Sequence, residues 1–527
     1  MDGARDAADA FRSLEQCTED ITNDPYNVLH YLTRASTYQK LGYPDLAAGD
    51  AYKALLLVDE ISDESGEYHD LAQASFDESE WELAKLQTAV YGILIQSLTD
   101  CKCFRSALTF ARQRKRTDQQ PDAVEAISNI LIQYREAAGI LGDEELDANK
   151  LPDNTMVRRE IYPWNKLEPD RNSDEYLSLL NVQLEGVAPK CEVRIVRLPV
   201  LTGGSGTTTQ LGLFAKENIQ PGENVLEESS ILTANNNLHD TLCDACSAEL
   251  PQLEEASQHF SCPDCDDIVF CSQECLDTAQ ELYHPAVCGK DIDSIARDSD
   301  SKEASDALYF LLLARAIAMA ETQGIHPLEL KETSSLWGDF AMVEPGAPAA
   351  KPSLPFSFIY NVLYPIHLLT QMDLDIYATT AKYDFWIFNT LYAKFRGVAS
   401  GRANARTGKP EVCAVHPLWC LANHSCAPNV SWKWSGDIKL IARRSDQLCR
   451  WGPRKDDGEK WKGGIKAGEE ILNHYCDIEL DVKQRREWAS GPLGGDCMCE
   501  RCIWGAEHEQ LDLGDLTIRG VSDKQSM

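Results

Sequence analysis

A series of cysteines between residues 243 and 288 constrains the fold of this chain more than any other feature. Seven cysteines and one histidine follow a regular spacing: Cys243-x2-Cys246-x15-Cys262-x2-Cys265-x5-Cys271-x3-Cys275-x8-His284-x3-Cys288. Eight soft ligands fill two tetrahedral zinc sites, and each Cys-x2-Cys pair places two thiolates on one ion through a tight turn. The Cys-x3-Cys and His-x3-Cys spacings place ligands about one helical turn apart on one face. Because disulfides or chance would not explain this order, we predict two zinc ions here.

The remaining composition is that of a folded, intracellular protein. The chain has 527 residues, enough for about three to four domains, and its apolar share of 43% allows a large core. Its N-terminus lacks an apolar signal region, and the longest apolar run, residues 307–320, contains Arg315 and is too short for a bilayer. In an intracellular protein, cysteines indicate metal binding rather than disulfides. We expect a soluble protein of the nucleus, the cytoplasm or both.

The charge balance narrows the range of partners. The formal net charge is −34, from 84 acidic and 50 basic side chains, which disfavours direct binding to nucleic acid. A zinc-dependent nucleic-acid-binding regulator is therefore a weak hypothesis. An acidic surface attracts a basic partner such as a Lys/Arg-rich peptide, although acidity that serves only solubility explains the charge equally well. The basic run 112–116 is a faint candidate for a nuclear import signal.

Residues 1–140 have the pattern of packed helices. Two helical stretches between residues 26 and 59 are joined near Gly42-Tyr43-Pro44, and a second pair covers residues 81–98 and 104–114. Small residues recur where the helices of a pair would touch: Ala35, Ala47, Ala51, Ala54, Ala107 and Ala111. This resembles the tetratricopeptide repeat, which implies binding of peptides or of other segments of the chain; a plain helical bundle is the alternative. Residues 141–190, acidic and rich in proline, are predicted to be a linker.

The pattern changes to strands at Cys191. Residues 192–198 alternate apolar and polar side chains, as a half-buried strand does. Residues 211–226 fit a strand, a Pro-Gly turn and another strand. Gly212 would let a ligand approach the backbone, since it lacks a Cβ, although packing alone also explains a glycine in a strand. Residues 300–400 are predicted to be mainly helical, and the aromatic run 383–389 to be core rather than a binding pocket.

A second cluster of polar and thiol side chains lies near the end of the chain. Asn423-His424-Ser425-Cys426 precedes strand-like runs at 430–434 and 439–442, and residues 465–477 are predicted to be a turn that enters a strand. Residues 444–464 are predicted to form an exposed loop. Cys497-x-Cys499-x2-Cys502 offers three thiolates, and zinc needs a fourth ligand, for which Cys426 is the candidate; a disordered terminal cluster is the alternative. The other cysteines are most simply buried thiols: Cys17, Cys101, Cys103, Cys191, Cys413, Cys420, Cys449 and Cys476.

Taken together, residues 191–505 resemble a SET-domain protein lysine methyltransferase of the SET-and-MYND family. Four features follow one another in the family's order: the Gly-Leu-Phe-Ala strand with its Pro-Gly turn, the inserted Cys/His series, Asn-His-Ser-Cys-x-Pro-Asn, and Gly-Glu-Glu-Ile-x3-Tyr with the Cys-x-Cys-x2-Cys tail. With the repeats at the N-terminus, the arrangement resembles fungal members.

This resemblance implies an α+β multidomain fold. A helical repeat array at 1–140 and an acidic linker at 141–190 would precede a β-rich SET domain at 191–478. A MYND zinc finger at 240–290 and a helical insert at 300–400 would interrupt the SET domain. A zinc-binding post-SET segment at 479–505 and a tail at 506–527 would follow.

The resemblance also implies the function and the site. The expected reaction is the S-adenosylmethionine-dependent methylation of a lysine in a histone or another protein. The expected cofactor-binding residues are Gly212, Leu213, Phe214, Asn423, His424 and Tyr475. The hydroxyl of Tyr475 would also orient the lysine amine. Zinc would be held by three sets: Cys243, Cys246, Cys271 and Cys275; Cys262, Cys265, His284 and Cys288; and Cys426, Cys497, Cys499 and Cys502.

Two positions depart from the family's pattern. Gln210 stands where a glycine is common, and Gly495 stands where an aromatic residue usually faces the cofactor. These departures keep an alternative open, a catalytically inactive SET/MYND scaffold or transcriptional regulator that binds protein partners. Without the resemblance, Tyr475 would most simply be a buried strand tyrosine and residues 423–426 a polar turn.

Overall fold

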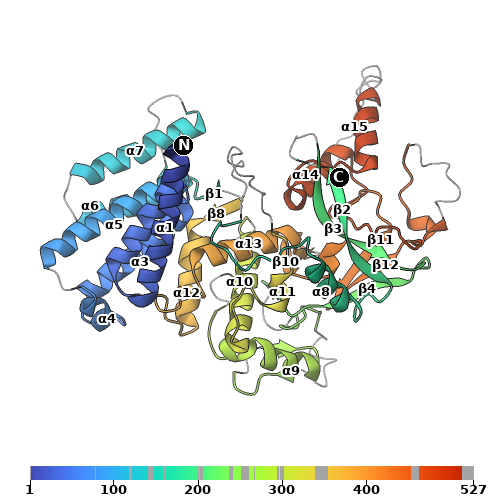
Figure 1. Ribbon diagram of the computed structural model, residues 1–527, viewed down its shortest axis with the longest axis horizontal. Helices are drawn as coiled ribbons and strands as arrows, with labels where there is room; N and C mark the ends of the chain where they lie inside the picture. Colours follow the sequence, from blue (N-terminus) through green and yellow to red (C-terminus); the bar gives the residue numbers. More distant parts are fainter. Residues whose placement is uncertain are drawn as a thin grey trace. The chain divides into compact units, whose positions relative to one another are not determined.

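The fold is known from a computed structural model of the chain (Figure 1). The structure describes residues 2–76, 79–117, 121–140, 147–157, 161–199, 201, 206–236, 241–250, 260–265, 268–292, 296, 302–338, 354–404, 406–452 and 462–512. Parts of the predicted linker (141–146 and 158–160), exposed loop (453–461) and tail (513–527) lie outside these residues. The chain divides into two units. Unit 1 comprises Met1–Asn165, Tyr283–Leu328 and Phe340–Ala393, and unit 2 comprises Lys166–Leu282, Glu329–Asp339 and Lys394–Met527.

Unit 1 is mainly helical. Its N-terminal elements are α1 (Asp2–Asn23), α2 (Val28–Leu41), α3 (Pro44–Ser62), α4 (His69–Ala74), α5 (Glu80–Asp100), α6 (Phe104–Thr117), α7 (Pro121–Ala138), η1 (Ala148–Lys150) and β1 (Asn154–Val157). Its later elements are η2 (His284–Ala286), α10 (Ala304–Gln323), β8 (Leu354–Ser357), η4 (Ile359–Leu363), α12 (Tyr364–Gln371) and α13 (Phe385–Val398), whose residues from Lys394 onward belong to unit 2. The mainly helical character predicted for residues 5–140 and 300–400 is confirmed over the residues that the structure describes.

The N-terminal helices follow from local signals in the sequence. Asn27 caps α2 by accepting a hydrogen bond from the backbone of Leu29, and Pro44 begins α3 in the first turn, where the missing N–H does no harm. Helices α2 and α3 pack against each other, and so do α3 with α5 and α5 with α6 (Figure 1). The two predicted helix pairs therefore correspond to α2–α3 and α5–α6.

A buried ionic network joins α2 and α3 to residues 376–384 within unit 1. Arg34 Nε lies 2.7 Å from Asp50 Oδ2, and Arg34 Nη1 lies 2.9 Å from Asp384 Oδ2. All three side chains are almost fully buried. Lys53 Nζ donates to the carbonyl of Ile376 over 2.7 Å. Most of the aromatic run lies in the core, as predicted: Tyr383, Phe385, Ile387 and Phe388 are buried, whereas Trp386 is partly exposed. The N-terminal helices and the region predicted as a helical insert thus share one core.

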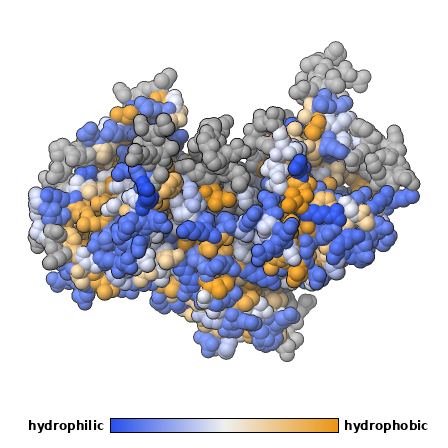
Figure 2. All heavy atoms as spheres, in the orientation of Figure 1, coloured by the Kyte–Doolittle hydropathy of each residue, from blue (hydrophilic) through white to orange (hydrophobic). Residues whose placement is uncertain are grey.

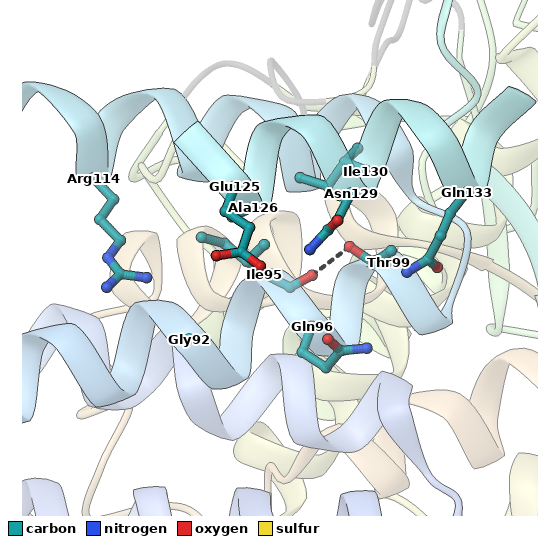
Figure 3. A pocket seen from close by; sticks show the side chains of 10 residues that line it. All are labelled: Gly92, Ile95, Gln96, Thr99, Arg114, Glu125, Ala126, Asn129, Ile130 and Gln133. Atoms are coloured by element: carbon teal, nitrogen blue, oxygen red, sulfur yellow. Dashed lines mark hydrogen bonds between the residues drawn. The ribbon is translucent and has the colours of Figure 1, made fainter. Parts of the chain in front are cut away.

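Unit 1 also contains a pocket between α5, α6 and α7 (Figure 3). Its lining is Gly92, Ile95, Gln96, Thr99, Arg114, Glu125, Ala126, Asn129, Ile130 and Gln133. In Figure 3 the side chains of Asn129 and Gln133 on α7 point toward α5. The hydroxyl of Thr99 donates to the carbonyl of Ile95 over 2.7 Å. None of the residues predicted to bind a cofactor or a metal lines this pocket, and those predicted to bind the cofactor all lie in unit 2.

Unit 2 mixes short strands and helices. Its elements up to residue 334 are α8 (Asp174–Leu184), β2 (Cys191–Pro199), β3 (Thr207–Ala215), β4 (Asn224–Ser229), β5 (Thr233–Asn235), β6 (Phe260–Ser261), β7 (Val269–Phe270), α9 (Gln273–Leu282) and α11 (Lys331–Ser334). The remaining elements are β9 (Ser400–Ala403), β10 (Pro410–Ala414), η5 (Trp419–Leu421), β11 (Val430–Ser435), β12 (Asp437–Ala442), η6 (Ser445–Gln447), α14 (Val482–Leu493) and α15 (Glu500–Asp512).

The strands of unit 2 pair antiparallel in small sheets (Figure 1). β2 and β3 form a ladder in which Cys191 faces Ala215 and Arg194 faces Gly212. β12 lies between β11 and β4, and β10 lies between β5 and β9. The predicted Pro-Gly turn between β3 and β4 is confirmed, because Gly222 has a φ of 83°, a left-handed conformation that glycine adopts without strain. The β2–β3 sheet and the sheet of β4, β12 and β11 enclose a common core that includes Leu213, Leu226 and Ile438.

Two segments differ from the sequence-based expectation. The predicted linker carries β1 and α8. α8 is amphipathic, with Tyr176, Leu180 and Leu184 buried at four-residue spacing. Because this apolar stripe needs a partner, the segment packs on β2 instead of remaining irregular. Residues 465–477, predicted to enter a strand, form single bridges at Ile465, Glu470 and Asn473 and no regular strand. Ile465 and Glu470 pair antiparallel with Ile219 and Phe214, but the turn at residues 467–468 interrupts that ladder, and Asn473 pairs parallel with His424.

On the face shown in Figure 2, hydrophilic side chains predominate and hydrophobic ones form separate patches. This agrees with the strongly acidic composition. Within the described ranges, no helix combines the length and the apolar character that crossing a membrane requires.

Candidate active site and metal centres

The predicted motifs meet in unit 2, where three segments cross. The backbone N–H of Asn473 donates to the carbonyl of Asn423, and the N–H of Ser425 donates to the carbonyl of Asn473, both over 2.8 Å. On its other side, the same segment donates from Ile471 N–H to the carbonyl of Leu213 over 2.7 Å. Residues 470–473 therefore lie between β3 and residues 423–425, and they bring together parts of the chain that are more than 200 residues apart.

Asn423 is held in one orientation at this crossing. Its Nδ2 donates to the carbonyl of Leu211 over 3.0 Å and to Glu470 Oε1 over 2.8 Å. Gly212 lies directly against this pair, since a Cβ at position 212 would come within 2.8 Å of Glu470 Oε1 and 3.0 Å of Asn423 Nδ2. Local packing therefore explains why a glycine occupies position 212, because any side chain here would displace Asn423 or Glu470.

Tyr475 forms hydrogen bonds with the residues on either side of Asn423, namely Ala422 and His424. Its hydroxyl donates to the carbonyl of Ala422 over 3.1 Å, and its backbone N–H donates to His424 Nδ1 over 3.0 Å. The two rings lie 5.1 Å apart. Burial raises the pKa of Tyr475 above its ordinary value, so the phenol stays protonated near neutral pH and can donate a hydrogen bond.

The other two predicted residues on β3 are placed differently from each other. The side chain of Leu213 is fully buried in the core, so any contribution to ligand binding comes from its backbone. Phe214 is partly buried, and the guanidinium of Arg194 lies 5.1 Å from the centre of its ring.

The first predicted metal set is assembled. The sulfur atoms of Cys243, Cys246, Cys271 and Cys275 lie within 4.8 Å of one another, with 3.7 Å between Cys246 and Cys271 and 3.6 Å between Cys271 and Cys275. The turn after Cys243 supplies two of these thiols, and Cys275 follows at the start of α9. Four thiols at this separation suit one tetrahedral zinc ion.

The second predicted set is divided by the boundary between the units. Cys262 and Cys265 belong to unit 2, whereas His284 and Cys288 follow directly after α9 in a segment of unit 1. Its assembly around one ion remains a prediction from the spacing.

The third predicted set joins the crossing to the end of the described chain. The sulfur atoms of Cys426, Cys497, Cys499 and Cys502 lie within 4.8 Å of one another, and Cys426 Sγ is 3.3 Å from Cys502 Sγ. Arg485 Nη2 donates to Cys502 Sγ over 3.7 Å, and Arg501 Nη1 donates to the carbonyl of Cys426 over 2.7 Å. The positive charge of Arg485 beside Cys502 Sγ favours the thiolate form, which zinc requires.

Three residues at the site were missed by the sequence reasoning. Glu470 contacts Asn423, and burial raises the pKa of its carboxyl. Asn473 is fully buried, and its Nδ2 has no hydrogen-bond partner within the described residues. Cys476 was expected to be a plain buried thiol, but its sulfur lies within 4.8 Å of the ligand atoms of Cys426 and His424. Glu470 lies inside the Gly-Glu-Glu-Ile motif, so the sequence could have identified it as a site residue. No motif or spacing in the sequence marks Asn473 or Cys476 as part of the site. Among the other predicted buried thiols, Cys420 and Cys449 are partly exposed.

The family model for the SET domain matches residues 210–476, just over half of the chain. This chain belongs to the SET-domain family. The matched range begins two residues before Gly212 and ends one residue after Tyr475, so the SET domain contains the whole crossing. A SET domain-containing protein of Acanthamoeba polyphaga mimivirus is 32% identical over 81 residues. That alignment covers 15% of this chain and only a quarter of the viral protein.

Proposed function

We propose that this protein transfers a methyl group from S-adenosylmethionine to a lysine side chain of another protein. SET domains are generally methyltransferase folds of this kind, and the matched range covers the crossing. The observation that carries the proposal is the meeting of Gly212, Asn423 and Tyr475 at that crossing. These are residues that the family resemblance assigns to the cofactor and the amine, and they come from three separate segments of the chain.

The polar groups at the crossing fit such a cofactor. Asn473 Nδ2 is a buried donor without a partner among the described residues, and a buried donor of this kind is satisfied when a ligand supplies an acceptor. The carboxylate of Glu470 and the amide of Asn423 suit an ammonium group such as that of the cofactor's amino acid moiety. When bound, S-adenosylmethionine supplies a methyl group on a positively charged sulfur. We assign its binding to Gly212, Asn423, Glu470 and Asn473, with backbone contributions from Leu213, Phe214 and His424.

Tyr475 would orient the lysine. Because its hydroxyl donates to the carbonyl of Ala422, the oxygen lone pairs are left to accept a hydrogen bond from the lysine amine. The phenol is not a base, because burial raises its pKa. The lysine would have to be neutral, and an apolar surrounding beside a cationic group would lower its pKa from about 10.4 by desolvation and charge repulsion. Alignment of the amine with the methyl group would then account for most of the rate, roughly 7–11 kcal/mol.

The metal sets have a structural role in this proposal. Four protein ligands close a zinc ion to substrate, so neither the two zinc ions of a MYND-type finger nor the one held by Cys426, Cys497, Cys499 and Cys502 would act in chemistry. The last ion would fix the C-terminal segment to the crossing. The helix pairs α2–α3 and α5–α6 would be tetratricopeptide-like repeats that bind peptides. The acidic chain would favour a basic protein substrate, histone or not, in the nucleus or the cytoplasm.

Calorimetric titration with S-adenosylmethionine separates this proposal from an inactive scaffold. The zinc-loaded protein is expected to bind one cofactor per chain, and the product S-adenosylhomocysteine should compete for the same site. A fully zinc-loaded protein that binds neither compound at millimolar concentration would contradict the methyltransferase and favour the scaffold.

A further inference from the structure

The imidazole of His424 lies between the crossing and the third cysteine set. Its Nδ1 accepts the backbone N–H of Tyr475 over 3.0 Å, and its Nε2 lies 3.3 Å from Cys426 Sγ. One ring therefore contacts the segment of the proposed catalytic tyrosine with one nitrogen and a proposed zinc ligand with the other.

The first of these contacts decides what the second nitrogen does. A nitrogen that accepts a hydrogen bond carries no hydrogen itself, so the ring of His424 must carry its hydrogen on Nε2. That N–H faces Cys426 Sγ, and 3.3 Å is a suitable length for an N–H···S hydrogen bond. The ligand atoms of His424, Cys426 and Cys476 are close enough to hold a metal ion together, but an Nε2 that bears hydrogen cannot be a ligand. The contact with Tyr475 thus favours a donor over a ligand.

A donor is also what this cluster requires. Zinc with four thiolates carries a net charge of −2, and hydrogen bonds to the sulfur atoms spread that charge in a buried place. Cys426 and Cys502 are fully buried. Arg485 of α14 donates to Cys502, and His424 of the same motif lies against Cys426, so each of these two sulfur atoms has a donor within reach.

We propose that His424 is a positioning residue that donates an N–H···S hydrogen bond from Nε2 to the Cys426 thiolate and so couples the zinc centre to the segment of Tyr475. This inference rests on the zinc ion of the proposed function, and it adds a physical link between that ion and the crossing. Loss of the ring would loosen the metal and, through the Tyr475 backbone, disturb the crossing as well.

Zinc release from the full-length protein tests this link without any cofactor. A chromogenic chelator in excess would be used to follow release from the wild type, His424→Leu and His424→Gln. Leucine removes both contacts of the ring, and we expect release from one site to be about tenfold faster, the lower end of what the loss of such a supporting partner does to metal affinity. Glutamine keeps a donor and an acceptor and should restore release to near the wild-type rate.

His474→Phe is the matched control. His474 is another half-buried histidine of the crossing, but its Nδ1 contacts the carbonyl of Cys476 and not a sulfur, so its loss should leave the release rate unchanged. With ¹¹³Cd in place of zinc, His424→Leu should shift the resonance of the Cys426 site and leave that of the Cys243 site in place. Equal release rates in the wild type and His424→Leu, with both resonances unmoved, would overturn the inference.

If His424→Leu does not fold, a measurement on the wild-type protein tests the inference instead. In the wild-type protein labelled with ¹⁵N-histidine, we expect His424 to show a hydrogen on Nε2. A hydrogen on Nδ1, or a metal-bound Nε2, would overturn the inference. Metal analysis of the wild type tests the zinc ion by itself, and cofactor titration tests the methyltransferase by itself, so the failure of either is distinguishable from the failure of the His424 link.

Discussion

At the residue scale, the site depends on close packing of two polar side chains against a glycine. The side chains of Asn423 and Glu470 lie close to the Cα of Gly212. These two side chains are joined by a hydrogen bond. The sequence could predict that Gly212 and Asn423 matter, since both lie in recognisable motifs. It could not predict that Glu470 lies against both of them, or that Asn473 Nδ2 is buried without a partner among the described residues, because these facts depend on three segments meeting in space.

We predict that Gly212→Ala weakens cofactor binding while the fold is kept. The added Cβ would come within 2.8 Å of Glu470 Oε1, so Glu470 must move and Asn423 loses its hydrogen bond. Losing one such charge-assisted bond, worth about 1.5–3 kcal/mol, corresponds to roughly tenfold to a hundredfold weaker binding, measurable by calorimetry. Gly401→Ala in β9 is the control, because there the nearest atom to a Cβ is 3.8 Å away. Equal affinity in the Gly212 variant and the wild type would contradict the assigned role.

At the element scale, the crossing is positioned by a buried carboxylate on β4. Glu228 accepts the backbone N–H groups of Leu418 and Trp419 over 3.1 and 2.7 Å, at the start of η5, and η5 leads directly into Asn423. Burial raises the pKa of Glu228 to about 7, although the two N–H groups and Lys331 oppose this, while Glu332 adds to it. Strand patterns predicted β2, β3, β4, β11 and β12, but no pattern marks a carboxylate that holds a distant turn.

Glu228 should make the stability of unit 2 depend on pH. Its pKa is raised from 4.5 to about 7 on folding, so its contribution is fully present below about pH 4.5 and is lost as the pH rises through about 7. The loss is on the order of 3 kcal/mol. In Glu228→Gln this slope should disappear, which hydrogen exchange of unit 2 between pH 5 and 8 would measure as a difference from the wild type.

Glu227→Gln provides the contrast on the same strand. Glu227 is paired with Lys439, and this hydrogen bond lowers its pKa. Its contribution is therefore present above its ordinary pKa and is lost only in acid, so removing it should leave the slope between pH 5 and 8 intact. The same slope in Glu228→Gln as in the wild type would show that Glu228 does not titrate in this window.

At the scale of the whole molecule, each of the two units draws on distant parts of the sequence. The sequence indicated helices in residues 5–140 and 300–400, but it gave no sign that α2 and α3 share a core with residues 376–388. That core depends on Arg34, Asp50 and Asp384, which are charged residues that a pattern of apolar positions assigns to the surface. Likewise, the cysteine spacing indicated zinc, and only the fold places Cys476 beside Cys426 and the ring of His424 against its sulfur.

Arg34→Met should destabilise unit 1 strongly. It leaves Asp50 and Asp384 buried without their cation, and breaking a buried ion pair on one side costs about 3–5 kcal/mol. Lys85→Met removes a half-exposed partner of Glu82 and should cost no more than about 1 kcal/mol. Denaturant unfolding, with hydrogen exchange to follow α2 and α3, compares the two variants. A similar small effect for both would mean that the network does not stabilise unit 1.

The most direct test of the account is methyl transfer itself. The zinc-loaded protein would be incubated with isotopically labelled S-adenosylmethionine and a proteome extract, and the labelled residues identified by mass spectrometry. We predict label on lysine side chains and about a hundredfold slower transfer by Tyr475→Phe, which loses the hydroxyl that orients the amine, with zinc content unchanged. Tyr176→Phe, which removes another hydroxyl bonded to a backbone carbonyl, should transfer at the wild-type rate. Label absent from lysine, or equal transfer by wild type and Tyr475→Phe, would contradict the account.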